Sequence, residues 1–137
     1  MAAAQTTAGL QKWIFDSNAQ TWNLAYTLQN ELALGAPYSV PGYQTGTNSS
    51  TGLPWAPATD GLRNITGTVS SDGTTATIYA ITSTVSGNSD QGADPYKLVA
   101  ITDNLAATTL PTTETFNTLR AAGNLEVLRG VSFAPGI

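Results

Sequence analysis

Residues 65–82 constrain the fold of this chain more than any other segment. Two runs rich in β-branched residues, 65–70 and 75–82, flank a short segment that contains Asp72-Gly73. An Asp-Gly pair between two such runs is the strongest local signal for a β-hairpin. The second run carries apolar residues on both of its faces, which is typical of a strand that is buried on both sides. We therefore expect a hairpin across 62–82 with a buried second strand.

Further strand patterns lie on both sides of this hairpin. In the segment 22–29, the residues Trp22, Leu24, Tyr26 and Leu28 alternate with polar or small ones, which predicts a strand with these four side chains on one buried face. It pairs with 10–15, so that Trp13 and Trp22 are expected to face each other in the core. Three more strands are expected at 96–102, 115–120 and 127–133.

The order of these strands predicts a repeat architecture. The seven expected strands form one complete unit of four antiparallel strands, at 62–120, flanked by two partial units. Repeated four-stranded units are typical of the blades of a β-propeller. We therefore expect an all-β fold with one complete and two partial blades over 10–137, preceded by a disordered or added tail at 1–9. The alternative is a compact β-sandwich of two sheets, which would need no partner.

The composition excludes several classes of function. Cysteine and histidine are absent from the 137 residues, which removes disulfides, thiolate nucleophiles, Ser-His-Asp triads and nearly all zinc sites. Charged residues make up 10% of the chain, against about 25% in an average domain. The five basic residues are scattered and the net charge is −4, so we expect neither nucleic acid nor an anionic membrane surface as a partner.

Three segments resemble the blade repeats of large secreted β-propeller proteins, many of which have no assigned activity. They are 61–67, 98–103 and 128–135, and the resemblance extends over about residues 10–135. These motifs are structural, so the resemblance implies a fold and an extracellular location but no catalytic residues. The residues at 1–5 lack the basic and apolar parts of a signal peptide, so we expect a secreted protein whose signal peptide is absent from this chain.

The resemblance also implies incompleteness, because the proteins concerned close rings of six to eight blades and this chain holds fewer than two. Isolated repeats bury too little surface to be stable, and open sheet edges recruit other strands. We therefore expect self-association into a ring or a filament, or association with missing blades.

Two long loops, 30–60 and 84–95, are expected on the face of a propeller that usually binds ligands. The first contains Tyr38, Tyr43 and Trp55 among asparagines and glycines, a combination that suits stacking on sugar rings. The competing interpretation, which we favour, is that these aromatic side chains anchor the loop to the sheet.

The remaining candidate sites carry weaker signals. Asp90 and Asp94 offer oxygen ligands to calcium, although turn formation explains them better. Asn48 and Asn64 lie in glycosylation sequons, which arise often by chance in a chain rich in threonine and serine. Asp16 and another aspartate, at position 103, follow equivalent expected strands, so we expect both carboxylates to tie turns rather than to hydrolyse glycosides.

These observations together predict a non-enzymatic extracellular protein that assembles with copies of itself through open blade edges and needs no cofactor. The alternative is a carbohydrate-binding module that uses the aromatic residues of the loop 30–60, with glycans as its partners.

Overall fold

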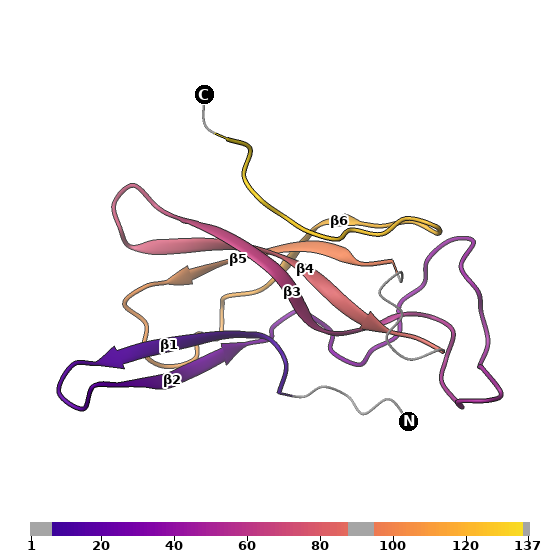
Figure 1. Ribbon diagram of the computed structural model, residues 1–137, viewed down its shortest axis with the longest axis horizontal. Coiled ribbons are helices and arrows are strands. Elements are labelled where there is room, and N and C mark those ends of the chain that lie inside the picture. The colour runs from indigo at the N-terminus through magenta and orange to yellow at the C-terminus, as the bar shows by residue number, and fades with distance from the viewer. Residues whose placement is uncertain (1–6, 88–94, 136–137) are drawn as a thin grey trace.

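The computed structural model describes residues 7–87 and 95–135, which form two antiparallel sheets (Figure 1). The six strands are β1 (Leu10–Asp16), β2 (Thr21–Leu28), β3 (Ala58–Val69), β4 (Thr75–Val85), β5 (Lys97–Asn104) and β6 (Asn117–Ala121). The described residues include no helix, and therefore none that could cross a membrane. The expected all-β class is confirmed.

The larger sheet is an antiparallel meander in the order β3-β4-β5-β6. It contains the predicted central hairpin and the two strands that were expected after it. In the turn, Asp72 accepts hydrogen bonds from the Ser70 hydroxyl (2.6 Å) and the Thr74 amide (3.1 Å), and Gly73 adopts a positive φ of 71°. The Asp-Gly pair therefore acts as the sequence predicts, because glycine enters the left-handed region without the strain of a Cβ atom.

The smaller sheet is the hairpin of β1 and β2, and its register contains one irregularity. Lys12 is paired with Tyr26, whereas the next residue, Trp13, is paired with Leu24, so that Ala25 is an extra residue in β2. Directly opposed residues project from the same face of an antiparallel pair, and consecutive residues of a strand project from opposite faces. The extra residue therefore reverses the alternation, and Leu24 lies on the opposite face from Tyr26.

This reversal overturns the expectation of one continuous buried face in β2. Tyr26 and Leu28 are buried, but Leu24 and Trp22 are exposed, and 65% of Trp22 is accessible. Trp13 is 48% exposed, so the expectation that the two tryptophans lie in the core is wrong. The outer face of the hairpin instead carries an aromatic patch, which consists of Trp13, Phe15, Trp22 and Leu24.

The hairpin packs its inner face against the meander, and the two sheets share the core. From the hairpin, the core contains Tyr26 and Leu28. The meander contributes Ala80, Val99 and Ile101. The connecting segments contribute Leu32 and Phe116. The two sheets are separate in their hydrogen bonding, so side chains hold the hairpin in place. This arrangement is consistent with blade-like sheets and with a sandwich.

The seventh expected strand, at 127–133, is not present. These residues belong to no sheet, and Figure 1 shows the C-terminal segment crossing the meander and then running away from the body of the molecule. Phe133 makes an edge-on ring contact with Tyr79, at 5.6 Å between centroids. The sequence pattern of a strand yields a strand only where a neighbour accepts its backbone hydrogen bonds, and this segment has no such neighbour within the described residues.

Candidate functional site

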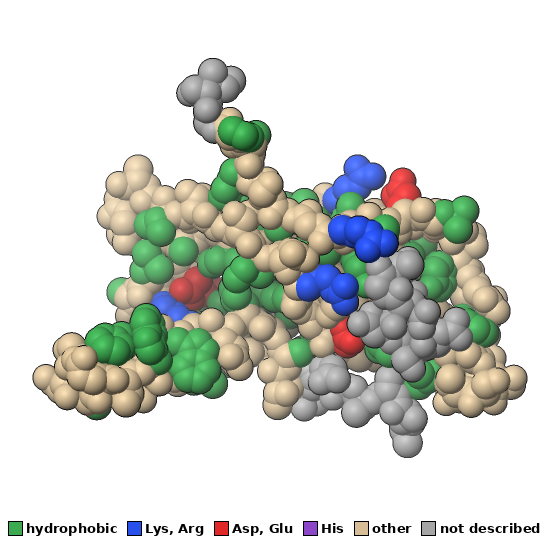
Figure 2. All heavy atoms as spheres, viewed as in Figure 1, with side chains coloured by type: hydrophobic (Ala, Val, Ile, Leu, Met, Phe, Trp, Pro, Cys, Tyr) green, Lys and Arg blue, Asp and Glu red, His purple; other side chains and the backbone are tan. Residues whose placement is uncertain are grey.

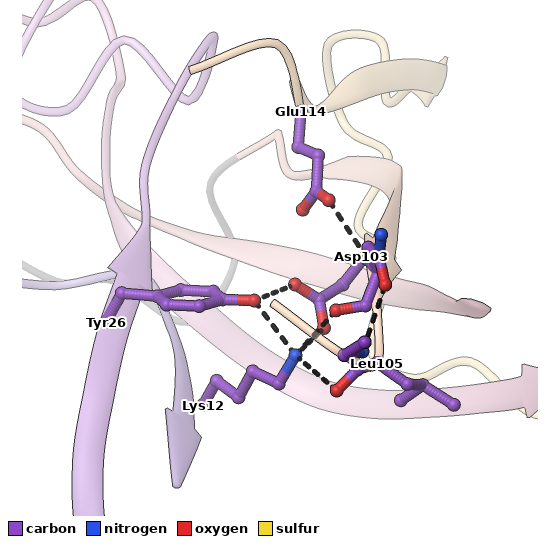
Figure 3. A network of polar contacts seen from close by, with 7 residues as sticks. Lys12, Tyr26, Asp103, Leu105 and Glu114 are labelled. Atoms are coloured by element: carbon purple, nitrogen blue, oxygen red, sulfur yellow. Dashed lines mark hydrogen bonds and ion pairs between the residues drawn. The ribbon is translucent and has the colours of Figure 1, made fainter. Parts of the chain in front are cut away.

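A polar cluster joins the hairpin to the meander at the edge of the core (Figure 3). Lys12 Nζ from β1 lies 2.9 Å from Asp103 Oδ2 at the end of β5, and their side chains are only 15% and 7% exposed. The hydroxyl of Tyr26, from β2, donates a hydrogen bond to Asp103 Oδ1 and accepts one of 3.0 Å from Lys12. Three strands therefore contribute one side chain each to the polar cluster, here Lys12, Tyr26 and Asp103.

The backbone that follows β5 completes the surroundings of Lys12. Its ammonium group donates to the carbonyl oxygens of Asn104 (2.7 Å) and Leu105 (3.2 Å). Burial acts to lower the pKa of Lys12, but the hydrogen bonds to Tyr26 and Asp103 and the charge of Asp103 outweigh it, so that the pKa is raised above 10.5. Burial raises the pKa of Tyr26 above 10.0, and the hydrogen bond to Asp103 adds to this effect. Lys12 is therefore charged and Tyr26 protonated at neutral pH.

Glu114 lies beside the polar cluster and is held by the amide of Asn104, which donates to its Oε1 at 3.0 Å (Figure 3). Its second oxygen, Oε2, is buried. Burial raises the pKa of Glu114 above 4.5, and the negative charge of Asp103 raises it further, against the hydrogen bond from Asn104 and the charge of Lys12. The folded chain therefore binds this proton more tightly than the unfolded chain does.

The raised pKa of Glu114 leads to a pH-dependent prediction for Glu114→Gln. A carboxyl whose pKa is raised by folding contributes its stabilisation below the ordinary value of 4.5 and loses it as the pH rises through the raised value. An amide has no charge to desolvate and does not repel Asp103. The variant should therefore unfold at a higher temperature than the natural chain at pH 7, and the difference should shrink as the pH falls toward 4.5.

Thermal unfolding measured by circular dichroism between pH 4 and pH 8 tests this prediction. Glu126→Gln is the control, because the pKa of Glu126 is lowered by the Gly123 amide and the nearby Arg120 rather than raised. If the unfolding temperatures of the natural chain and of Glu114→Gln differed by the same amount at every pH from 4 to 8, the prediction would be wrong.

A cavity of about 270 Å³ opens next to the polar cluster, between the hairpin and the meander. Most of the residues that line it are apolar, namely Leu10, Trp13, Leu28, Ala76, Ile78 and Leu105. Its polar lining residues are Gln11, Lys12 and Asp103. Figure 2 shows hydrophobic side chains along both sides of the hollow between the hairpin and the sheet, with acidic and basic side chains inside it. The cavity is therefore better suited to apolar side chains or ligands than to a strongly charged ligand.

The aromatic residues of the loop 30–60 make contacts with the body of the chain. The Tyr38 hydroxyl donates to the carbonyl of Pro95, and the ammonium of Lys97 lies 3.8 Å from the centre of its ring. The ring of Trp55 packs so closely on Gly87 that a Cβ atom there would come within 2.6 Å of it. Tyr43 is half-buried, and its amide donates to Val40 at 3.0 Å. These placements favour the anchoring of the loop.

The other predicted site residues fall in different surroundings. The side-chain amide of Asn48 donates to the carbonyl of Gly87 at 2.7 Å. Glycosylation of that nitrogen would therefore disrupt a hydrogen bond that holds the loop 30–60 in place. Asn64 is exposed and adopts a φ of 48° at an irregularity in β3. Asp90 and Asp94 lie outside the described residues, and within those residues no cluster of three or more potential metal-ligating side chains occurs.

The two aspartates that were expected to tie turns behave differently. Asp16 accepts hydrogen bonds from the amides of Asn18 (2.8 Å) and Ala19 (3.1 Å), which confirms the prediction for this residue. After β5 that role belongs to Asn104, whose side chain accepts from the amide of Ala106 at 2.9 Å, and Asp103 turns into the polar cluster instead. The one sequence signal for the polar cluster is Lys12, a charged residue between Leu10 and Ile14 on the same face of a strand.

Comparisons with models of protein families, with curated proteins and with solved structures found no match. A function for this chain therefore rests on its own geometry.

Proposed function

We propose that this chain is a non-enzymatic, extracellular assembly protein that associates with copies of itself through open strand edges and exposed apolar faces. The observation that carries the proposal is the aromatic patch of the hairpin, whose members are between 43% and 65% exposed. A large aromatic side chain covers roughly 150–250 Å² when it is buried, so the patch presents several hundred Å² of apolar surface. Patches of that size on soluble domains usually mark an interaction surface.

The charges of the polar cluster support a structural rather than a chemical role. Lys12 and Asp103 contact each other, Tyr26 and the backbone after β5, and Glu114 lies beside them. These contacts connect strands of the two sheets. A charge that is fixed in this way stabilises one arrangement of the strands. The alternative, carbohydrate binding through the loop 30–60, has less support because the rings of Tyr38 and Trp55 pack against the chain itself.

Trp22→Ser tests the proposed self-association. Truncation of a tryptophan at the centre of an interface commonly costs more than about 1.4 kcal/mol, which is a tenfold change in affinity. We therefore expect the concentration at which half of the chains are associated to rise at least tenfold. Light scattering after gel filtration, over a series of concentrations, gives the mass at each point.

Leu125→Ser is the matched control, because Leu125 is 96% exposed but lies outside the aromatic patch. A natural chain that is monomeric at every concentration would rule out the assembly function. In that case a change in tryptophan fluorescence on addition of glycans, lost in Trp55→Ala, would support the carbohydrate-binding alternative.

A further inference from the structure

The free strand edges of this chain differ in how readily they accept another strand. In the meander, the first part of β3 is already covered, since Pro37 bridges to Ala58 and the Gly35 amide donates to Thr59 at 2.8 Å. Two register shifts interrupt β3, and β6 is only 5 residues long. Extra residues and short lengths are the usual ways in which natural sheets protect their edges.

The hairpin has one protected and one open edge. β2 carries the extra residue Ala25, whereas β1 runs for 7 residues with each of them paired to β2. On its other side, β1 has no hydrogen-bonded strand among the described residues. The side chain of Lys12, which would otherwise protect this edge with a charge, is turned inward to Asp103. β1 is therefore the edge that is best suited to pair with a further strand.

Apolar surface borders this edge on both faces of the hairpin. On the inner face lies the cavity, which Leu10 and Leu28 of the hairpin and Ile78 of the meander help to line. On the outer face lie Trp13, which also contributes to the lining of the cavity, and Phe15, at 48% and 43% exposure. A strand alongside β1 would thus place one row of side chains over the cavity and the other beside the aromatic patch, as cross-strand neighbours do in a sheet.

The chain also contains a strand-like segment without a sheet, the C-terminal segment 127–133. Its alternate residues Val127, Arg129, Val131 and Phe133 form one row, which is apolar except for Arg129, and the opposite row begins with Leu128. Within its own copy this segment lies on the wrong side of the meander to reach the cavity. Phe133 contacts Tyr79, whereas the adjacent Ile78, which projects from the opposite face of β4, lines the cavity.

We propose that residues 127–133 of one copy add as a third strand to the free edge of β1 in a second copy. The proposal rests on the proposed self-association and names its interface. A segment that belongs to no sheet and crosses the meander before the chain turns away from the body supplies the strand (Figure 1), and an unprotected edge with apolar borders receives it. A reciprocal exchange between two copies closes a dimer, whereas a one-way exchange from copy to copy builds a filament.

Two substitutions at the same position test the backbone pairing. Val131→Pro removes an amide donor and cannot continue a hydrogen-bonded ladder, whereas Val131→Ala shortens the side chain and keeps the amide. The residue belongs to no sheet in the single copy, so both variants should keep the natural circular dichroism spectrum. By light scattering, we expect the association of Val131→Pro to be weaker than that of Val131→Ala by at least tenfold.

Cross-linking between chains identifies the receiving edge. The natural chain has no cysteine, so that introduced thiols can pair only with each other. A mixture of the single variants Gln11→Cys, on β1, and Ser132→Cys should form the mixed disulfide faster than a mixture of Thr68→Cys, on β3, and Ser132→Cys.

The outcomes separate the interface from the assembly function. A natural chain that stays monomeric overturns both. A natural chain that associates, with Val131→Pro associating equally well or with the β3 thiol cross-linking faster, overturns the strand exchange and leaves the assembly function standing.

Discussion

Asp103→Ala should lower the free energy of unfolding by about 3 kcal/mol, because it leaves Lys12 charged in a partly buried site without its counter-ion. Breaking a buried ion pair by removal of one partner typically costs about 3–5 kcal/mol. The pair here lies at the less buried end of that class, with Lys12 15% exposed. The variant also removes the acceptor of the Tyr26 hydroxyl. Urea unfolding followed by circular dichroism measures the change.

Asp16→Ala is the matched control for this variant. Its carboxylate also accepts two hydrogen bonds, but from the amides of an exposed turn, and the loss of such a bond costs about 1 kcal/mol. Equal losses of stability in the two variants would show that the polar cluster contributes no more than an ordinary turn. A large loss in Asp103→Ala alone supports its role in joining the two sheets.

Leu28→Ala is expected to have an effect of similar size, about 3 kcal/mol, since replacement of a buried leucine by alanine usually costs about 2–5 kcal/mol. Leu28 is 1% exposed, belongs to the core cluster and also lines the cavity. The substitution enlarges a space that is already present and removes apolar contacts between the hairpin and the meander. Urea unfolding again measures the change.

Leu125→Ala controls for the chemistry of the substitution. Leu125 is 96% exposed, so its truncation should change the stability by no more than about 0.5 kcal/mol. If Leu28→Ala were as stable as Leu125→Ala, the hairpin would not be packed on the meander in solution.

The meander could be predicted from the sequence because its signals are local. The Asp-Gly turn, the apolar run that becomes β4 and the run that becomes β5 each specify their structure within about ten residues, and consecutive strands pair with one another. The segment 127–133 carries the same kind of local signal and forms no strand. A sequence pattern reports what a segment prefers, whereas a strand also needs an available edge.

The faces of β2 could not be predicted, because one extra residue changes them. The alternation of Trp22, Leu24, Tyr26 and Leu28 is regular in the sequence, and only the pairing with β1 reveals that Ala25 interrupts it. Such irregularities depend on the partner strand and on the packing of the inner end of the hairpin. Trp13, Trp22 and Leu24 were therefore expected in the core and are found on the surface.

The polar cluster could not be predicted for a different reason. Tyr26 and Asp103 are separated by 77 positions, and Lys12 and the Asn104 carbonyl by 92. No spacing rule connects such residues, and the approach of the hairpin to the end of β5 decides which charges meet. For the loop 30–60 the sequence left two interpretations open, and the contacts of Tyr38 and Trp55 favour anchoring.

In the part of the chain that the structure describes, the two sheets do not share backbone hydrogen bonds, so the hairpin can separate from the meander without unfolding of the meander. Among the described residues, no backbone ladder crosses from β1 or β2 to the meander, and the hairpin is attached by the core side chains and the polar cluster. We therefore expect the hairpin to open as a cooperative unit of its own. Its amides should therefore exchange with deuterium earlier than those of β4, which has a neighbour on each side. The partial opening that this exchange reports would bare the inner face of the hairpin while leaving the meander folded.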